Sequence, residues 1–511
     1  MLVGSEDILM CPDSQALDGS SGAVGSSKSK SLGRETHREP AYVYLMLLGS
    51  FALTGLVFVA LYFGLYPYLT ITPPSTDGAS GGPVGPPLSL ASRVLSSVVD
   101  LLTAVFASRP ALVLFYSILM ASTFLNEFSY MPLAFYHRRI QKERTSVKLT
   151  GFPLICVIVP AHNEEKTIET TITTLLEQNY PNKEITVVND GSTDGTAAIA
   201  SPYAASGQIT LLNRAVSGGK AIALNTGIAA THAEIIVVVD ADSALQRDAL
   251  MRIAAHFENE QVQAVSGNVK IGNKVNLLTK LQNLEYLRGI NLRRRAFDIL
   301  DTELVVPGAV GAFRRSTYAQ VGSLDSSTVV EDMDQTVKMV KAANDIQYDP
   351  LVVAYTEAPE NLKGLARQRR RWYGGTLQVF LKHRHKWWKY GPLSFIGFPY
   401  LILTMFLVPV IELITLTLLF VYLYQGLYFG VLLSAISILA IELVLSSAAV
   451  YLDHDDWRLV LYTPIYAFVY RYILDVIRMK AYLDVFRHKM TWTRVERRGD
   501  LSGKIRDTAR L

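Results

Sequence analysis

Cysteine is nearly absent from this chain of 511 residues, which contains only Cys11 and Cys156. Two cysteines without a CxxC pair offer no disulfide framework, so a reducing compartment fits the bulk of the chain. A strong excess of one charge is also lacking, and a formal net charge of +4 gives no reason to expect a nucleic-acid partner. No compact signal peptide with a small-residue cleavage site opens the chain.

Apolar sequence, by contrast, is abundant, because half of the residues are hydrophobic and the mean hydropathy is +0.23. Soluble chains of this size usually have a negative value, so we expect membrane segments. Residues 1–40 are rich in Ser, Gly and charge and predict a disordered tail. Two candidate spans follow at 41–69 and 110–136, although Asn126 and Glu127 weaken the second.

Positive charge flanks this pair of candidate spans on its outer sides. The flanking basic residues are Lys28, Lys30, Arg34 and Arg38 before the first span, and His137, Arg138, Arg139, Lys142, Arg144 and Lys148 after the second. The loop between the spans carries only Arg93 and Arg109. The positive-inside rule therefore predicts cytoplasmic flanks and an extracytoplasmic loop.

A second membrane region is expected in the C-terminal part of the chain. Its parts are interfacial amphipathic helices at 361–391, transmembrane helices within 392–478 (near 396–424, 428–450 and 459–477), and a basic cytoplasmic tail at 479–511. The third of these spans carries Arg471 and Asp475. Three spans would place the basic tail outside the cytoplasm. We therefore favour an even number, through an additional piece broken near Pro409 or a segment lying in the interface.

Between the two membrane regions, residues 150–360 have the pattern of a soluble α/β domain. Short apolar runs alternate there with helix-length amphipathic segments, at 154–160, 184–189, 208–213, 234–240 and 262–267. This rhythm is typical of βαβ units around a mostly parallel sheet with flanking helices. We expect a multi-pass protein of the cell membrane whose soluble domain lies in the cytoplasm.

The fourth apolar run ends on two acids, Asp240 and Asp242. A buried parallel strand would place them at the carboxyl edge of the sheet, where α/β proteins bind ligands. Alternate residues of an extended chain point the same way, so both carboxylates can converge on one divalent cation and its phosphate ligands. Alternatively, the two acids cap the next helix, which is expected to begin near Gln246.

Polar residues also follow the other predicted strands. Asp190 follows the second strand and can accept a hydrogen bond from a base ring N–H, while Asp194 can cap the next helix. Lys220 follows a Gly pair after the third strand, an arrangement that lets backbone approach a phosphate. The spacing is not that of a P-loop, and a solvated lysine at a helix start is an equally simple interpretation.

Two later motifs complete the set. Glu331, Asp332 and Asp334 begin an amphipathic helix, and one of them can serve as a general base for a sugar hydroxyl; helix N-terminal charge preference is the alternative. In 368–375, arginine can neutralise a departing diphosphate while Trp372 stacks on a sugar ring. A basic amphipathic helix at the membrane surface is the other interpretation, and both can hold.

This ordered set resembles the processive, membrane-embedded family-2 glycosyltransferases, which include cellulose, hyaluronan, chitin-oligomer and poly-N-acetylglucosamine synthases. The resemblance covers about 153–385 and implies a GT-A-type fold inserted between N- and C-terminal transmembrane helices. It is strongest towards the poly-β-1,6-N-acetylglucosamine synthases in Lys220-Ala-Ile-Ala-Leu, Val265-Ser-Gly-Asn, Ala312-Phe-Arg-Arg and Leu362-Lys-Gly-Leu. The family usually has Thr before its Glu-Asp pair, whereas Val330 stands there in this chain.

The resemblance also implies residue roles. Ala161, Glu164 and Asp190 would line the nucleotide pocket, Asp240 and Asp242 would hold the diphosphate with Mg²⁺ or Mn²⁺, Asp332 would be the catalytic base, and Lys220, Gly308, Glu331, Gln368, Arg371 and Trp372 would contact donor or acceptor. The expected partners are a UDP-sugar, the growing polysaccharide, the lipid bilayer and accessory membrane subunits.

The function expected from the resemblance is inverting, processive transfer from a UDP-sugar. The product would be a β-linked polysaccharide of the poly-N-acetylglucosamine kind, moved across the membrane. One alternative is a non-processive transferase that adds a single sugar to a lipid phosphate carrier. Another is an inactive membrane receptor that binds a nucleotide or a glycan. No residue pattern names the sugar.

Overall fold

The computed structural model describes residues 128–144, 149–424, 426, 428–487 and 489. The predicted N-terminal tail, the first candidate span, the loop after it and most of the second span lie outside these residues. So do residues 488 and 490–511 of the predicted C-terminal tail, whereas residues 479–486 of that tail belong to helix α18 (Arg471–Phe486).

An eight-stranded sheet forms the centre of the soluble domain, in the order β3-β2-β1-β4-β7-β6-β8-β5. The strands are β1 (Ile155–Ala161), β2 (Lys183–Asp190), β3 (Thr210–Arg214), β4 (Ile235–Val238), β5 (Ser243–Leu245), β6 (Val262–Ile271), β7 (Gly311–Arg314) and β8 (Asp345–Thr356). Pairing is parallel from β3 through β4 and between β6 and β8, whereas β7 and β5 are antiparallel to their neighbours. The predicted α/β class and mostly parallel sheet are confirmed.

Strand β1 explains why the sheet lies inside the domain. Ile155 and Val157 pack on one face with Ile168 of α5 (Ile168–Leu176), and Cys156 and Ile158 pack on the other with helix α7 (Lys220–Ala229). Both faces bury apolar side chains, as a continuous apolar run predicts for a central parallel strand. Each fully buried Val or Ile side chain contributes roughly 1.5–3 kcal/mol.

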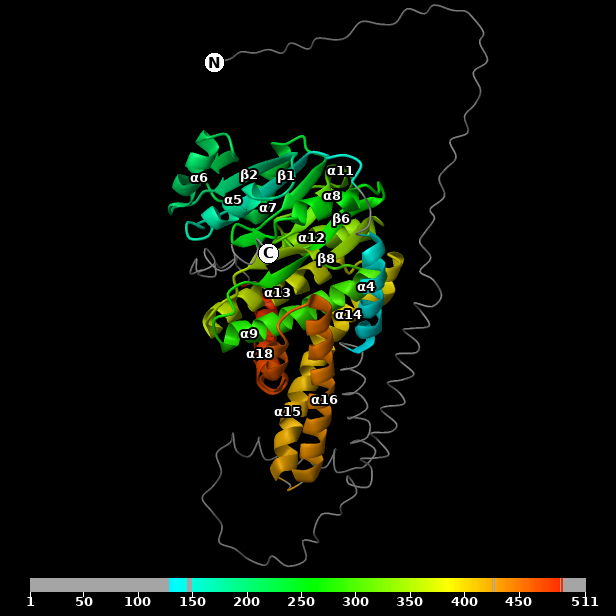
Figure 1. The fold of residues 1–511 in the computed structure, drawn as a ribbon. Helices are drawn as coiled ribbons and strands as arrows, with labels where there is room; N and C mark the ends of the chain where they lie inside the picture. Colours follow the sequence, from blue (N-terminus) through cyan, green and yellow to red (C-terminus); the bar gives the residue numbers. More distant parts are fainter. Residues whose placement is uncertain (1–127, 145–148, 425, 427, 488, 490–511) are drawn as a thin grey trace, which may run out of the picture.

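Helices cover both faces of this sheet (Figure 1). They are α5 (Ile168–Leu176), α6 (Thr196–Ala205) and α8 (Ala249–Phe257) with one buried cluster, and α7 (Lys220–Ala229), α11 (Arg315–Val321) and α12 (Glu331–Lys341) with the other. Between the sheet and the C-terminal helices lie α9 (Leu277–Glu285), the π-helix η2 (Tyr286–Leu292), α10 (Arg293–Ile299) and α13 (Leu362–His383). The layer formed by α9, η2, α10 and α13 therefore joins the sheet to the C-terminal helices.

The basic run after the second candidate span is partly structural. It belongs to helix α4 (Met131–Arg144), which follows the short η1 (Phe128–Tyr130). His137 is fully buried, with its Nε2 3.2 Å from the carboxylate of Asp298, and Arg144 Nη1 is 2.6 Å from that carboxylate. Burial by itself would raise the pKa of Asp298, but the charge of Arg144 and the His137 contact outweigh it and lower the pKa to about 2.

We expect Asp298→Asn to loosen α4 from the domain. Removing one partner of a buried ion pair costs about 3–5 kcal/mol, so the melting midpoint of the purified protein should fall by several degrees. Because the folded-state pKa is lowered, the wild-type contribution is present above about pH 4 and is lost as the pH falls towards 2. Melting curves of both proteins should converge over that acidic window, and an unchanged midpoint at neutral pH would contradict the assignment.

Three helices among the described residues are long and apolar enough to cross a membrane: Leu393–Val421, Ser434–Asp453 and Trp457–Phe486. They comprise η4 (Leu393–Gly397), α14 (Phe398–Ile402), η5 (Leu403–Leu407), α15 (Val408–Tyr424), α16 (Tyr428–Asp453), η6 (Trp457–Tyr462), α17 (Thr463–Ile465), η7 (Tyr466–Tyr470) and α18 (Arg471–Phe486), with η3 (Trp387–Lys389) before them. Figure 1 shows α15 and α16 side by side, extending away from the sheet. The first of the three begins with π-helical turns and runs through Pro409 without a break, so the piece expected near Pro409 is not a separate helix. The even number of spans and the predicted membrane orientation stay predictions.

Each of these three helices contributes a charged residue to one cluster. Arg471 contacts Glu412 and lies 2.5 Å from Glu442, and Arg288 of η2 lies 2.5 Å from the other oxygen of Glu442. Charges inside a membrane are costly unless they are paired, and pairing of this kind also joins helices. Arg471, which weakens the third span as a sequence pattern, is therefore one of two arginines that pair with two glutamates.

Candidate functional site

A cavity of about 440 Å³ lies between the sheet, helices α12 and α13, η2 and the C-terminal helices. Nine of the predicted site residues line it: Lys220, Asp240, Asp242, Gly308, Glu331, Asp332, Gln368, Arg371 and Trp372. They come from segments far apart in the chain, so the tertiary structure brings most of the predicted set together. Ala161, Glu164 and Asp190 are not among the lining residues.

Lys220 is the centre of the acidic part of this cavity. Its Nζ lies 2.6 Å from Asp240 Oδ1 and 3.2 Å from Glu331 Oε1. Burial alone would lower the pKa of Lys220, but the charges of Asp240, Glu331 and Asp332 raise it above its ordinary value. The lysine is therefore a permanent cation, held where a diphosphate could exchange for one of its carboxylate partners.

The backbone of Gly308 lies against this ion pair. A Cβ built at Gly308 would collide with Lys220 Nζ and lie 3.3 Å from Asp240 Oδ1. Its amide nitrogen is 3.4 Å from Asp332 Oδ2. The absence of a side chain is what lets the lysine reach Asp240, so this glycine shapes the cavity floor.

Asp332 lies in the first turn of α12, with its Oδ1 accepting a hydrogen bond from the Met333 backbone N–H at 2.8 Å. Burial and the neighbouring charge of Glu331 raise the pKa of Asp332, and the charge of Lys220 offsets part of this rise. A carboxylate with a raised pKa is a stronger base towards a hydroxyl proton. Asp332 thus combines position in the cavity with suitable acid–base chemistry.

The earlier predicted residues lie at the carboxyl ends of β1 and β2. The carboxylate of Asp190 accepts hydrogen bonds from Ser217 Oγ at 2.8 Å and from the Gly219 backbone N–H at 2.9 Å, and it is paired with Arg214. These bonds hold the loop that leads into Lys220, so Asp190 helps to fix the position of Lys220 in the cavity. The base-binding role of Asp190 stays a prediction.

Ala161 is the buried last residue of β1, and Glu164 belongs to the loop that follows it. The backbone N–H of Glu164 donates to Thr196 Oγ1 at 2.7 Å, and its carboxylate accepts from Thr167 Oγ1 at 3.0 Å. Both residues therefore lie at the same sheet edge as Asp190, next to the cavity rather than in its lining. Their predicted contact with a nucleotide is untested.

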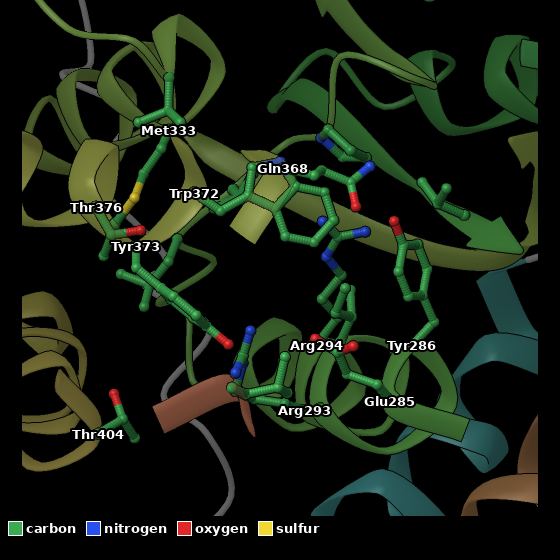
Figure 2. Close-up of a pocket in the computed structure, with 18 of the residues that line it drawn as sticks. Glu285, Tyr286, Arg293, Arg294, Met333, Gln368, Trp372, Tyr373, Thr376 and Thr404 are labelled. Carbon is green, nitrogen blue, oxygen red and sulfur yellow. The ribbon is translucent and has the colours of Figure 1, made fainter. Parts of the chain in front are cut away.

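The Gln368–Trp372 motif lies on α13, whose first turn is capped by Asn361 accepting from the Gly364 N–H at 2.8 Å. Figure 2 shows Gln368 and Trp372 next to each other on the cavity wall, close to Tyr286 and Glu285. Arg371 lines the cavity as well. Several α13 side chains, including Gln368 and Leu377, are buried against neighbouring elements, so the helix packs inside the protein along at least one face.

Helices α12 and α13 pack closely at Val330, where the sequence differs from the usual pattern of the family that it resembles. A Cβ added to Gly375 of α13 would lie 2.6 Å from a methyl group of Val330, the residue before the Glu331-Asp332 pair. The Val329 backbone N–H also donates to Gln378 Oε1 at 3.2 Å. In place of a hydroxyl, Val330 therefore presents methyl groups that fit the glycine surface of α13.

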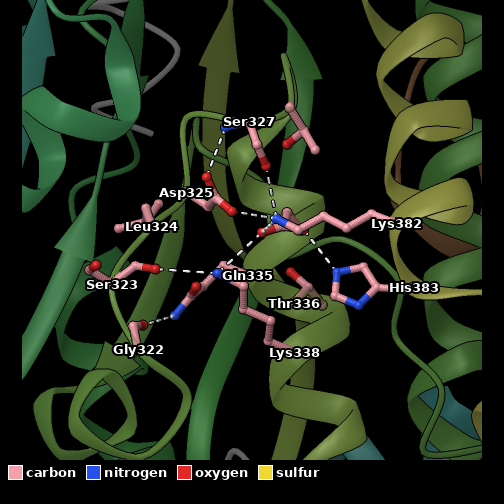
Figure 3. A network of polar contacts seen from close by, with 12 residues as sticks. Gly322, Ser323, Leu324, Asp325, Ser327, Gln335, Thr336, Lys338, Lys382 and His383 are labelled. Carbon is pink, nitrogen blue, oxygen red and sulfur yellow. Dashed lines mark hydrogen bonds and ion pairs between the residues drawn. The ribbon is translucent and has the colours of Figure 1, made fainter. Parts of the chain in front are cut away.

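A buried polar network holds the same two helices together further along (Figure 3). Asp334 is fully buried on α12 and accepts from His383 Nε2 at 2.8 Å and from Lys382 Nζ at 3.0 Å, both on α13. Lys382 also reaches Asp325 at 2.6 Å in the loop before α12. Asp334 is one of the three acids that the sequence suggested as a general base. In the structure its carboxylate joins α12 to α13.

We expect Gly375→Ala to separate the two helices and misplace the groups on both. Forcing a methyl group into such a contact typically costs about 1–3 kcal/mol, and the same shift should lower turnover. The double substitution Val330→Ala with Gly375→Ala should recover much of the loss, because it removes the colliding methyl groups. Gly151→Ala is the matched control, since nothing lies within 4 Å of a Cβ there.

Other cavity residues were not predicted from the sequence. They include Glu285, Arg293, Arg294, Glu303, Glu412 and Arg471. Burial raises the pKa of Glu303 to about 7, against the lowering effect of Arg294 and Arg293. The sequence features that could have indicated these residues are the Arg293-Arg294-Arg295 run and the single acids within apolar spans. Such features do not by themselves show which residue the charged side chain contacts.

Part of this domain is similar in sequence to known proteins. Residues 156–322 match the family model described as Glycosyl transferase family 2. That stretch contains Asp190, Lys220, Asp240 and Asp242, whereas Asp332 and the Gln368–Trp372 motif lie beyond it.

Curated relatives named poly-beta-1,6-N-acetyl-D-glucosamine synthase match a longer part of the chain. The synthase of Staphylococcus epidermidis (strain RP62A) is 32% identical over 244 residues, which cover 48% of this chain and 58% of the relative. The synthase of Staphylococcus aureus (strain COL) is 29% identical over 270 residues, covering 53% of this chain and 66% of the relative. The chain thus spans less than two thirds of the length of these relatives.

Among solved structures, a mannosyltransferase from Pyrobaculum calidifontis in complex with GDP-Man and Mn²⁺ aligns with a TM-score of 0.49 and 22% identity. The alignment covers 74% of this chain and all of that chain.

Proposed function

We propose that this protein is an inverting, processive glycosyltransferase that polymerises a β-linked polysaccharide from a UDP-sugar at a membrane. The product is of the poly-N-acetylglucosamine kind, in keeping with the names of the curated relatives. One observation carries the proposal: a single cavity joins the Lys220–Asp240–Asp332 group to Gln368, Arg371 and Trp372, and continues to residues of the membrane helices.

The donor end of the cavity has the charges that a nucleotide diphosphate requires. Lys220 and Arg371 supply cations, and Asp240 and Asp242 supply carboxylates beside them. The UDP moiety would reach from this group towards Asp190 and the loop after β1. As UDP leaves, the two cations would stabilise the charge that develops on its terminal phosphate.

A divalent cation fits this donor set as part of the substrate complex. Within the described ranges, no group of three or more His, Cys, Asp or Glu side chains could hold a metal ion. Mg²⁺ characteristically binds through one or two carboxylates together with substrate phosphates and water, rather than in a cage made only of protein. Asp240 and Asp242 would hold Mg²⁺ or Mn²⁺, which would neutralise diphosphate charge when bound.

Asp332 would act as the base. The acceptor hydroxyl loses its proton to the Asp332 carboxylate while its oxygen attacks the anomeric carbon, and the bond from that carbon to the UDP oxygen breaks. Attack from the side opposite UDP inverts the configuration and gives a β-linkage. The ring of Trp372 offers a stacking surface for the acceptor sugar.

Translocation of the product is the further part of the proposal. The cavity lining includes Thr404, Glu412 and Arg471 from candidate membrane helices, so the acceptor end faces the membrane region. A growing chain would move from Trp372 along these residues as each sugar is added. We also propose that the catalytic domain lies on the cytoplasmic side of the membrane and that accessory membrane subunits are partners of this protein.

The test is a screen of UDP-sugars with the full-length protein in detergent or nanodiscs with Mn²⁺. UDP release from UDP-N-acetylglucosamine, with product that a β-N-acetylglucosaminidase digests, is the expected result. EDTA should abolish release, and added Mn²⁺ or Mg²⁺ should restore it. Asp242→Asn should raise the metal concentration needed.

Product length separates the alternatives. A ladder or smear of long products supports polymerisation, whereas a single sugar on an extracted lipid identifies transfer to a lipid phosphate carrier. Release of UDP from no UDP-sugar, with retained nucleotide or glycan binding, would identify a receptor instead.

A further inference from the structure

We propose that the Glu285–Arg369 ion pair is a positioning device for Trp372 and Gln368, and that Tyr470 connects it to the third candidate membrane helix. The inference rests on the proposed function, which assigns the acceptor end of the cavity to Trp372. It concerns two residues, Glu285 and Arg369, that are not among the predicted site residues.

Arg369 is fully buried and contacts two aromatic rings. Its guanidinium carbon lies 4.2 Å from the centre of the Trp372 ring and 5.8 Å from that of Tyr286, and these two rings are 6.0 Å apart. A guanidinium stacked on tryptophan is attracted by the ring face, most strongly where water is excluded. The orientation of Trp372 therefore depends on where Arg369 is held.

Glu285 at the end of α9 sets the position of Arg369. The Nε and Nη2 atoms of Arg369 donate to the two oxygens of Glu285 at 2.9 and 2.8 Å, and Nη1 donates to Gln368 Oε1. A two-pronged contact of this kind fixes the plane of the guanidinium as well as its distance. The same cation consequently orients Gln368 and Trp372 together.

Tyr470 brings the membrane region into this arrangement. It belongs to η7 within the Trp457–Phe486 helix, and its hydroxyl donates to Glu285 Oε2 at 2.6 Å. Glu285 thus contacts α13 and the third candidate span through one carboxylate. A displacement of that span would be transmitted to the tryptophan on the cavity wall by three contacts in series.

Arg370 provides a matched control on the same helix. It is the next residue along, its Nε lies 2.6 Å from Asp484 Oδ2 of α18, and neither arginine is among the residues that line the cavity. A structural role in joining α13 to the C-terminal helices would be common to both arginines. Of the two, only Arg369 stacks on Trp372. Comparing Arg369→Lys with Arg370→Lys therefore separates positioning of Trp372 from attachment of α13 to the C-terminal helices.

The experiment compares Arg369→Lys, Glu285→Gln and Tyr470→Phe with Arg370→Lys, using the full-length protein and UDP-N-acetylglucosamine with Mn²⁺. Arg369→Lys and Glu285→Gln should lower kcat by roughly 10- to 100-fold with little change in the donor KM, because displacement of a contact group affects turnover strongly. Tyr470→Phe should lower kcat less, and Arg370→Lys should leave it near the wild-type value. A wild-type kcat in Glu285→Gln would overturn the proposal.

A charge-swapped variant separates positioning from folding. Glu285→Arg with Arg369→Glu restores opposite charges, so the melting midpoint should recover relative to either single substitution. The kcat should not recover, because a carboxylate cannot stack on Trp372 as a guanidinium does. Joint recovery of the melting midpoint and kcat would show an ion pair with a structural role only.

Fluorescence gives a readout that does not require turnover. The Trp372 contribution is the difference between spectra recorded with and without Trp372→Phe, in each background. This contribution should shift to longer wavelength in Arg369→Lys and Glu285→Gln and stay constant in Arg370→Lys. If the wild type released no UDP, the proposed function would fail while this shift still decided the positioning role; an absent shift would overturn it.

Discussion

Asp332→Asn is expected to remove transfer almost completely while nucleotide binding stays near normal. The substitution keeps the size of the side chain and its contact with the Met333 backbone N–H, but it cannot accept the hydroxyl proton. General-base catalysis of this kind contributes roughly 10²–10⁴-fold, so kcat should fall by about that factor. UDP release measures kcat, and calorimetric titration with UDP and Mn²⁺ measures binding.

The control for Asp332 is an acid that does not line the cavity. Asp248 precedes α8 and pairs with Arg252, and it is absent from the cavity lining. Asp248→Asn should preserve both kcat and UDP binding. Substantial residual turnover in Asp332→Asn would remove it from the role of base, and a parallel loss of UDP binding would indicate a role in holding the donor.

Lys220→Met should be the second most damaging substitution. It removes the cation from a group that contains Asp240, Glu331 and Asp332, so three carboxylates would remain in one buried region beside an incoming diphosphate. Loss of a preorganised charge at a reacting centre typically costs 10²–10³-fold in rate, and the donor KM should also rise. Steady-state kinetics with varied UDP-N-acetylglucosamine separates the two effects.

Two further variants bracket the lysine result. Lys220→Arg keeps the charge and should retain more activity than Lys220→Met, although the broader guanidinium has to fit beside Gly308. Lys142→Met removes an exposed lysine of α4 outside the cavity lining and should behave as wild type. Equal activity of Lys220→Met and wild type would contradict a role for Lys220 in donor binding or catalysis.

The sequence by itself determined the class of the soluble domain and most of its strands. The five predicted apolar runs correspond to β1, β2, β3, β4 and β6. Strands β1 and β4 are buried on both faces and are therefore continuously apolar, whereas β3 is partly exposed. Strands β5, β7 and β8 were not predicted. β5 and β7 are only three and four residues long, and β8 contains polar residues. Short strands paired at a distance have little periodicity of their own to detect.

Candidate catalytic and binding residues could also be recognised from short sequence patterns, but their arrangement in space could not. Asp240, Asp332 and Trp372 stand out by position beside a strand or in a helix, and such patterns are short-range. That Lys220 lies between Asp240 and Glu331, or that Arg369 connects Glu285 to Trp372, depends on contacts across most of the domain. Periodicity encodes which face of an element is buried, not which element covers it.

The membrane region shows the same division. Composition alone predicted apolar helices after the soluble domain, because length and hydropathy suffice for that. Only the tertiary structure paired Arg471 with Glu412 and Glu442, which lie on different helices. A charged residue in an apolar segment either argues against a membrane span or forms an ion pair with a residue of another helix. The sequence does not identify that second residue, because helix packing brings the two together.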